Sequence, residues 1–116
     1  YSTSKPGRLY LVRWFSDKDH SLGFIKFGIT NLQLNSRTRR QKSESGLCLE
    51  VIMDLYFTDG KIPKILEDAI KSKFKTKVVN KSVFPDGYTE TLNLTDLECV
   101  INFVNNYTME FYNGLS

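Results

Sequence analysis

The sequence predicts an α+β fold, and three observations carry this prediction. The runs Arg8–Phe15 and Phe24–Thr30 are rich in aromatic and β-branched residues, which are typical of strands. Farther along, Ile62–Lys75 places its apolar residues at helical spacing. The chain of 116 residues is long enough for one domain with a single core and too short for two. We therefore expect a small three-stranded antiparallel sheet flanked by helices in the order β-β-α-β-α, followed by a C-terminal helix.

The first two strands are expected to pair as an antiparallel hairpin. The segment between them, SDKDHSLG, is a loop rich in turn residues, so the hairpin should have a long tip. Both strands carry large apolar side chains on both faces, so the sheet should be covered on both sides. Leu47–Phe57, the most apolar stretch of the chain, predicts the third strand.

Three segments are expected to be helical. The first is the polar, basic stretch Asn31–Glu44, which should end at Gly46 and could be capped by any of four residues: Thr30, Asn31, Asn35 or Ser36. The second, Ile62–Lys75, follows a turn at Asp59-Gly60 and carries Pro63 in its first turn.

The third helix is predicted over residues 95–112, opened by the capping box Thr95-Asp96-Leu97-Glu98. Before it, residues 78–92 have no regular pattern and contain a turn at Pro85-Asp86-Gly87. With no visible linker or repeat, residues 1–116 are expected to form a single domain. Because the sequence starts at Tyr1, this domain is interpreted as a piece of a longer protein.

The composition excludes several classes of protein. The fractions of hydrophobic (41%) and charged (25%) residues are those of a globular chain and not of a disordered one. No apolar run reaches the roughly 18–20 residues needed to cross a bilayer, so we expect no contact with a membrane. Two cysteines, Cys48 and Cys99, are too few for a disulfide framework and indicate buried, reduced thiols in an intracellular, cytoplasmic protein.

Charge is distributed unevenly along the chain. All 16 Lys and Arg residues lie within residues 1–81, whereas residues 82–116 contain five acidic residues and no basic one. A gathering of positive charge in one part of a small domain is expected for a protein that binds a polyanion. A lysine-rich face that serves only solubility is an equally good interpretation of charge alone.

Five candidate site residues lie on the predicted strands and helices. Tyr10 lies in the first strand, and Lys26 and Gly28 lie in the second. Arg37 falls on the basic helix, and Glu67 falls on the amphipathic helix. Glu67 is at the border of the apolar stripe of that helix, so its carboxylate could face the sheet instead of bulk water.

In these residues the chain resembles the GIY-YIG nuclease family, over about residues 8–74. The first signature of the family falls on Arg8-Leu9-Tyr10, where only the tyrosine remains, and the second falls on Lys26-Phe27-Gly28. Lysine in place of the second tyrosine is similar to a branch that contains restriction enzymes and phage proteins. Such a protein would act in the host cytoplasm if it is encoded by a phage.

The resemblance implies a divalent-metal-dependent endonuclease that hydrolyses phosphodiester bonds in DNA. Glu67 would be the ligand of a Mg²⁺ or Mn²⁺ ion, and Arg37 would bind a phosphate oxygen. Tyr10 would be the general base. Because a free phenol is almost wholly protonated at neutral pH, Lys26 would have to favour its phenolate form, which requires both side chains on one face of the hairpin.

The expected partner is double-stranded DNA, held at its phosphates by exposed basic residues: Arg39, Arg40, Lys42, Lys64 and Lys71, with the other lysines up to Lys81. Recognition of a target would need a homodimer or an additional DNA-targeting domain. Asp68 should face water. Glu90 is interpreted as part of a capped turn, with a second metal-ligand role as the alternative, and His20 as a solvated loop residue.

Two other functions remain open from the sequence. The first is a module on the same fold that binds nucleic acid without cleaving it. The second is a small α+β interaction domain whose basic patch only confers solubility.

Overall fold

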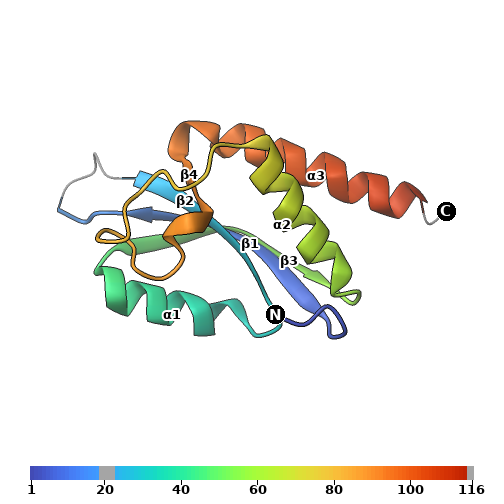
Figure 1. Cartoon of the computed structure of the whole chain (residues 1–116), viewed down its shortest axis with the longest axis horizontal. Coiled ribbons are helices and arrows are strands. Elements are labelled where there is room, and N and C mark those ends of the chain that lie inside the picture. The colour runs from blue at the N-terminus through green and yellow to red at the C-terminus, as the bar shows by residue number, and fades with distance from the viewer. Residues whose placement is uncertain (19–22, 115–116) are drawn as a thin grey trace.

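A computed structural model of the chain describes residues 1–18 and 23–114 (Figure 1). It contains strands β1 (Gly7–Phe15), β2 (Gly23–Thr30), β3 (Cys48–Phe57) and β4 (Thr91–Asn93). Their order in the sheet is β3-β1-β2-β4, and all neighbours are antiparallel. The predicted α+β class and the β1–β2 hairpin are confirmed, but the sheet has four strands and not the predicted three.

The fourth strand was missed because it is only three residues long and lies in the segment expected to be irregular. β4 pairs with β2 along Phe24–Lys26 alone. Thr91 fixes this contact, because its hydroxyl donates to the carbonyl of Tyr88 (2.7 Å) and accepts from the amide of Val78 (3.1 Å). These two hydrogen bonds tie β4 to the loop before it, and Leu92, which is fully buried in the core, packs it against the sheet.

Three α-helices accompany the sheet: α1 (Leu34–Ser45), α2 (Lys61–Lys73) and α3 (Leu97–Gly114). α1 ends as predicted at Gly46, which has a left-handed φ of 70° and donates its N–H to the carbonyl of Lys42. None of the four expected caps begins α1. Its N-cap is Gln33, whose side chain makes no capping hydrogen bond. The side chain of Asn31 instead binds the N-terminal segment, and that of Thr30 accepts a hydrogen bond from the amide of Leu32.

The start of α3 also differs from the prediction. A single 3₁₀ turn, Leu94–Asp96, precedes the helix, which begins at Leu97 inside the expected capping box. A second 3₁₀ turn, Tyr88–Glu90, follows Gly87. Among the described residues, no helix is both long and apolar enough to cross a membrane.

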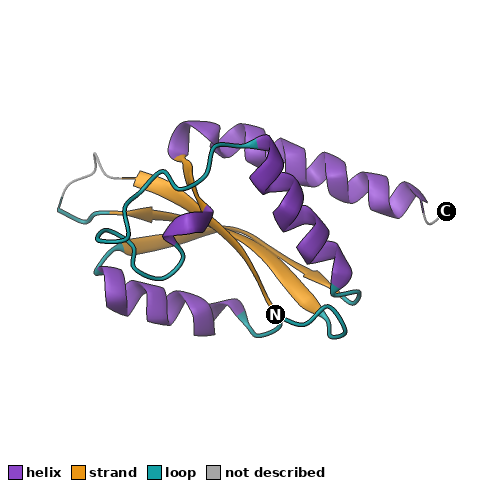
Figure 2. Cartoon of the chain, viewed as in Figure 1, coloured by secondary structure: helices purple, strands orange, loops and turns teal. Residues whose placement is uncertain are grey.

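Two hydrophobic clusters lie on opposite faces of the sheet, as the apolar strands predicted, and Figure 2 shows helices on both sides of the sheet. Odd-numbered residues of β1 pack against α2 and α3, where Leu66, Ile70, Val100 and Val104 are buried. Even-numbered residues of β1 pack with Leu34 of α1 and with Phe84 of the long loop after α2. The sheet is thus covered by two helices on one face and by α1 with this loop on the other.

The cysteines are both reduced, as predicted, but they are not buried. Cys48 is half-buried and Cys99 is exposed. Cys48 lies at the start of β3, an outer strand of the sheet, and Cys99 lies on the polar side of α3.

Phe84 is expected to be essential for the packing of the loop that covers the second face. Its ring is 5.0 Å from that of Trp14 and 5.3 Å from that of Phe24, and it is 1% exposed. We expect Phe84→Ala to lower the free energy of unfolding by about 3–5 kcal/mol, measured by chemical denaturation, because it opens a cavity among aromatic rings. Met109→Ala, at a residue 60% exposed on α3, is the control and should change stability by less than about 0.5 kcal/mol.

Candidate functional site

The register of the β1–β2 hairpin brings three of the predicted residues together. Tyr10 lies opposite Gly28, and Lys26 lies opposite Val12. Because alternate residues of a strand share a face, Tyr10, Lys26 and Gly28 point to the same side of the sheet. The ammonium of Lys26 is 5.5 Å from the centre of the Tyr10 ring. The expectation that both side chains share one face is confirmed.

Gly28 makes room for the phenol of Tyr10. A Cβ at this position would lie 2.6 Å from Cζ of Tyr10 and 3.1 Å from Nζ of Lys26. Any larger residue would therefore displace the hydroxyl of Tyr10. The glycine of the second signature has a steric role in this hairpin.

Lys26 is 2% exposed, and its ammonium donates a hydrogen bond to the carbonyl of Phe27. The left-handed residue Gly87 (φ 97°) covers it, since a Cβ there would collide with Cε of Lys26. Burial of an ammonium is costly unless a negative charge lies near it. Glu90, three residues after Gly87, supplies that charge.

Glu90 interacts electrostatically with both Lys26 and Lys71. Burial alone would raise the pKa of its carboxyl, but the hydrogen bond from Thr89 and the charges of Lys26 and Lys71 outweigh it and lower the pKa. Lys71 contacts Glu90 at 3.5 Å and Glu67 at 3.4 Å. The capped-turn interpretation of Glu90 omitted this pairing with two lysines.

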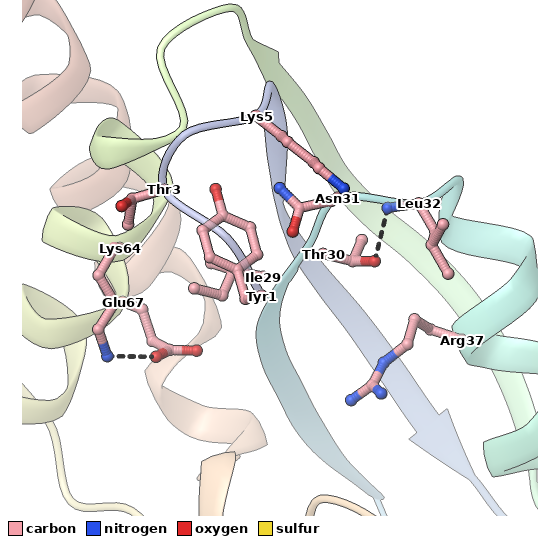
Figure 3. Close-up of a pocket in the computed structure, with 10 residues that line it drawn as sticks. All are labelled: Tyr1, Thr3, Lys5, Ile29, Thr30, Asn31, Leu32, Arg37, Lys64 and Glu67. Atoms are coloured by element: carbon pink, nitrogen blue, oxygen red, sulfur yellow. Dashed lines mark hydrogen bonds and ion pairs between the residues drawn. The ribbon is translucent and has the colours of Figure 1, made fainter.

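A pocket of about 670 Å³ opens at the end of β2, where β4 no longer pairs with it (Figure 3). Arg37 of α1 borders it on one side, and Lys64 and Glu67 of α2 border it on the other. The N-terminal segment and the end of β2 complete its wall with Tyr1, Thr3, Lys5, Ile29, Thr30, Asn31 and Leu32. Two helices that pack on opposite faces of the sheet thus meet around its open edge.

Only two of the four predicted catalytic residues line this pocket. Arg37 and Glu67 do, whereas Tyr10 (0% exposed) belongs to the second hydrophobic cluster and Lys26 (2% exposed) is buried. The hydroxyl of Tyr10 and Nε of Arg37 are both buried without a hydrogen-bond partner in the described part of the chain. Such groups are costly in a folded protein and are often found where a ligand or water binds.

Glu67 is 8% exposed although it sits on an amphipathic helix. Its Oε1 contacts the ammonium groups of Lys64 and Lys71, each at 3.4 Å. The neighbouring Asp68 faces water as predicted, with its side chain 59% exposed and 3.2 Å from Lys64. Glu67 therefore differs from Asp68 in that its side chain is largely buried.

The pocket suits a metal ion that needs few protein ligands. In the described residues, no group of three or more His, Cys, Asp or Glu side chains could enclose a metal. Glu67 would be a single hard oxygen ligand, which is how Mg²⁺ often binds, with water and substrate phosphates as its other ligands. The two lysines that contact Glu67 do so at long distances and have partly exposed side chains, so they could move aside.

A second tyrosine lies beside Glu67. The hydroxyl of Tyr1 donates to the carbonyl of Gly60 at 2.8 Å. Partial burial, with the negative charges of Glu67 and Asp59, raises the pKa of this phenol. Tyr1 therefore stays protonated at neutral pH.

Gln41 is a polar residue of the site that the sequence analysis missed. It lies one turn after Arg37 on α1 and is 1% exposed, and neither atom of its amide has a hydrogen-bond partner among the described residues. A Cβ on Gly87 would lie 3.4 Å from its Nε2 and 3.3 Å from Nζ of Lys26. The spacing of Leu34, Thr38 and Gln41 on one helix face could have indicated it, but Leu34 is the only apolar member.

The residues predicted to contact DNA are exposed on two helices. Arg39, Arg40 and Lys42 lie on α1, where Arg40 pairs with Glu44 at 3.1 Å. Lys64 and Lys71 lie on α2 beside Glu67. His20 falls outside the described residues.

Comparison with known proteins shows a similarity to a phage protein. The chain is 31% identical over 110 residues, or 95% of its length, to a protein of Escherichia phage T5 named "Putative endonuclease". The aligned part is 43% of the phage protein, so the chain spans less than half of that relative. No protein family model matches the chain, and no solved structure matches it.

The lowered pKa of Glu90 predicts a specific acid sensitivity. A carboxyl whose pKa is lower in the folded than in the unfolded state stabilises the fold above its usual value near 4.5, and this contribution is lost as the pH falls through the lowered pKa. We expect wild type to be more stable than Glu90→Gln at pH 7 and the difference to shrink below about pH 4.5. Denaturation midpoints of the two proteins across this range measure it, and a constant difference would contradict it.

Proposed function

We propose that this chain is the catalytic unit of a divalent-metal-dependent endonuclease of the GIY-YIG type, acting on double-stranded DNA. The observation that carries the proposal is the meeting of Arg37 and Glu67 across one pocket, next to the paired Tyr10 and Lys26. The similarity to a phage protein with an endonuclease name supports the same class of activity. Exposed basic residues on α1 and α2 would hold the phosphate backbone.

Each side chain has a role in the proposed hydrolysis. Water attacks phosphorus and gives a proton to the phenolate of Tyr10. The bond between phosphorus and the 3′ oxygen breaks, and the leaving oxygen takes a proton from solvent water, which gives a 5′-phosphate and a 3′-hydroxyl. Lys26 favours the phenolate, and Arg37 offers its guanidinium to a phosphate oxygen. Mg²⁺ or Mn²⁺ bound by Glu67 would supply charge neutralisation at the phosphate.

One finding favours a second function, the module that binds nucleic acid without cleaving it. Tyr10 and Lys26 are closed to solvent, so in this conformation Tyr10 cannot reach a water in the pocket. Catalysis therefore requires a conformation in which water reaches the hydroxyl of Tyr10. Without it, the basic helices can still bind phosphates.

Metal removal separates the two functions. Supercoiled plasmid should be nicked with Mg²⁺ and remain intact with a chelator, as judged by agarose gel electrophoresis. Glu67→Gln should reduce nicking to the level seen with the chelator, because it removes the one carboxylate among the described residues that line the pocket. Asp68→Asn, at the adjacent exposed carboxylate, is the matched control and should retain the parental rate.

These gels also distinguish the alternatives. Salt-sensitive DNA binding without metal-dependent nicking would favour the non-cleaving module, and no binding at physiological salt would favour the interaction domain. A Glu67→Gln variant that cuts at the parental rate would exclude the metal-ligand role.

Replacing Tyr10 by phenylalanine tests the general base. The rate of cleavage should fall by about 10²-fold or more, because a positioned base contributes that much. Stability should hardly change, since the hydroxyl of Tyr10 makes no hydrogen bond among the described residues. Tyr56→Phe, on the outer strand β3, is the control. An unchanged rate in Tyr10→Phe would remove this residue from the mechanism.

A further inference from the structure

Tyr1 stands at the pocket as a half-exposed aromatic ring in a fixed position. Its exposed fraction is 50%, and the ring lies between the helix that carries Lys64 and Glu67 and the side that carries Arg37 (Figure 3). Neither the proposed phosphate chemistry nor the hydrophobic core uses this ring.

Two glycines form a socket for the phenol end of Tyr1. The hydroxyl donates to the carbonyl of Gly60 at 2.8 Å. A Cβ on Gly7 would lie 2.7 Å from Cζ of Tyr1, so a side chain there would occupy the place of the phenol. The hydroxyl end is thereby anchored against backbone, while the rest of the ring faces the pocket.

Asn31 holds the segment that carries Tyr1. Its Oδ1 accepts from the amide of Ser2 at 2.6 Å, and its Nδ2 donates to the carbonyls of Ser2 and Pro6, each at 2.9 Å. Asn31 lies directly after β2 and itself lines the pocket. The N-terminal segment is therefore tied to the same strand end that forms the site.

A rigid, exposed aromatic ring beside cationic groups suits one kind of ligand. Nucleobases stack on such rings, while Arg and Lys bind the adjoining phosphates. Leu32, 63% exposed on the Arg37 side of the pocket, adds apolar surface of the kind that fills a gap left by an unstacked base. Bases inside a duplex present only their edges, so stacking here requires an unpaired base.

We propose that the pocket takes an unpaired nucleobase, stacked on Tyr1, next to the phosphate held by Arg37. The inference deepens the proposed function, on which it rests for the identity of the phosphate. The substrate is then a nucleotide lifted out of the duplex stack or lying in a single strand. Tyr1 is a residue that positions the substrate and determines its class, and it takes no part in proton transfer.

The test compares two single-stranded octamers with equal numbers of phosphates, one of deoxyadenylate and one wholly abasic. Binding is measured by fluorescence anisotropy in the presence of a chelator, so no cleavage occurs. The wild-type chain should bind the octamer with bases about tenfold more tightly than the abasic one, as expected for one stacked base. Tyr1→Leu should abolish this preference and leave the affinity for the abasic octamer unchanged.

Two further variants control for unrelated effects. Tyr56→Leu removes a ring of similar exposure (54%) on β3, outside the pocket, and should keep the preference. Gly7→Ala keeps Tyr1 but fills its socket, and it should lose the preference while circular dichroism shows an intact fold.

The outcomes are distinct from those of the nuclease assay. Equal base preference in wild type and Tyr1→Leu, or loss of preference in Tyr56→Leu, would overturn the inference. Tighter binding by Tyr1→Leu would also overturn it, because the ring would then obstruct the pocket. Since the measurement needs no cleavage, a chain that never nicks plasmid can still show the preference, and an active nuclease can lack it.

Discussion

The antiparallel register of β1 and β2 is the constraint on which the site depends. Tyr10 lies opposite Gly28, and Lys26 is two residues from Gly28 on the same face. A slip of one residue would send Tyr10 and Lys26 to opposite sides of the sheet. Gly28 completes the arrangement, because the phenol occupies the space that a side chain would need. A phenol and an ammonium are thus fixed in contact inside the protein, where the nearby charge of Glu90 offsets the cost of burying Lys26.

The pocket between α1 and α2 depends on the shortness of β4. Because β4 pairs with β2 only along Phe24–Lys26, the last part of β2 remains an edge around which α1 and α2 approach each other. Arg37 and Glu67 come from helices on opposite faces of the sheet and still line one pocket. A longer fourth strand would have covered this edge and separated the two side chains.

Some features of the fold could be predicted from the sequence, and others could not. The strands, the end of α1 at Gly46 and the amphipathic α2 follow from local patterns that the structure confirms. The predicted N-cap of α1 was wrong: Asn31 makes its hydrogen bonds with Ser2 and Pro6, far along the chain, and Asn35 and Ser36 lie inside the helix. β4 was not predicted because it is only three residues long and is placed by contacts with distant segments: backbone pairing with β2 and the hydrogen bond between Thr91 and Val78. Gln41 was overlooked because a buried amide on a polar helix gives no hydrophobic signal.

The sequence by itself determined the three helices, the three longer strands and their order, because the spacing of apolar residues along a strand or helix shows which side chains share a face. The pairing register of β1 and β2 then placed Tyr10 and Lys26 on one face. Only the tertiary structure decided which of these side chains water can reach. Arg37 and Glu67 border a pocket, whereas Tyr10 and Lys26 are enclosed by α1 and the loop around Gly87. Accessibility depends on contacts between segments distant in sequence, which no local pattern encodes.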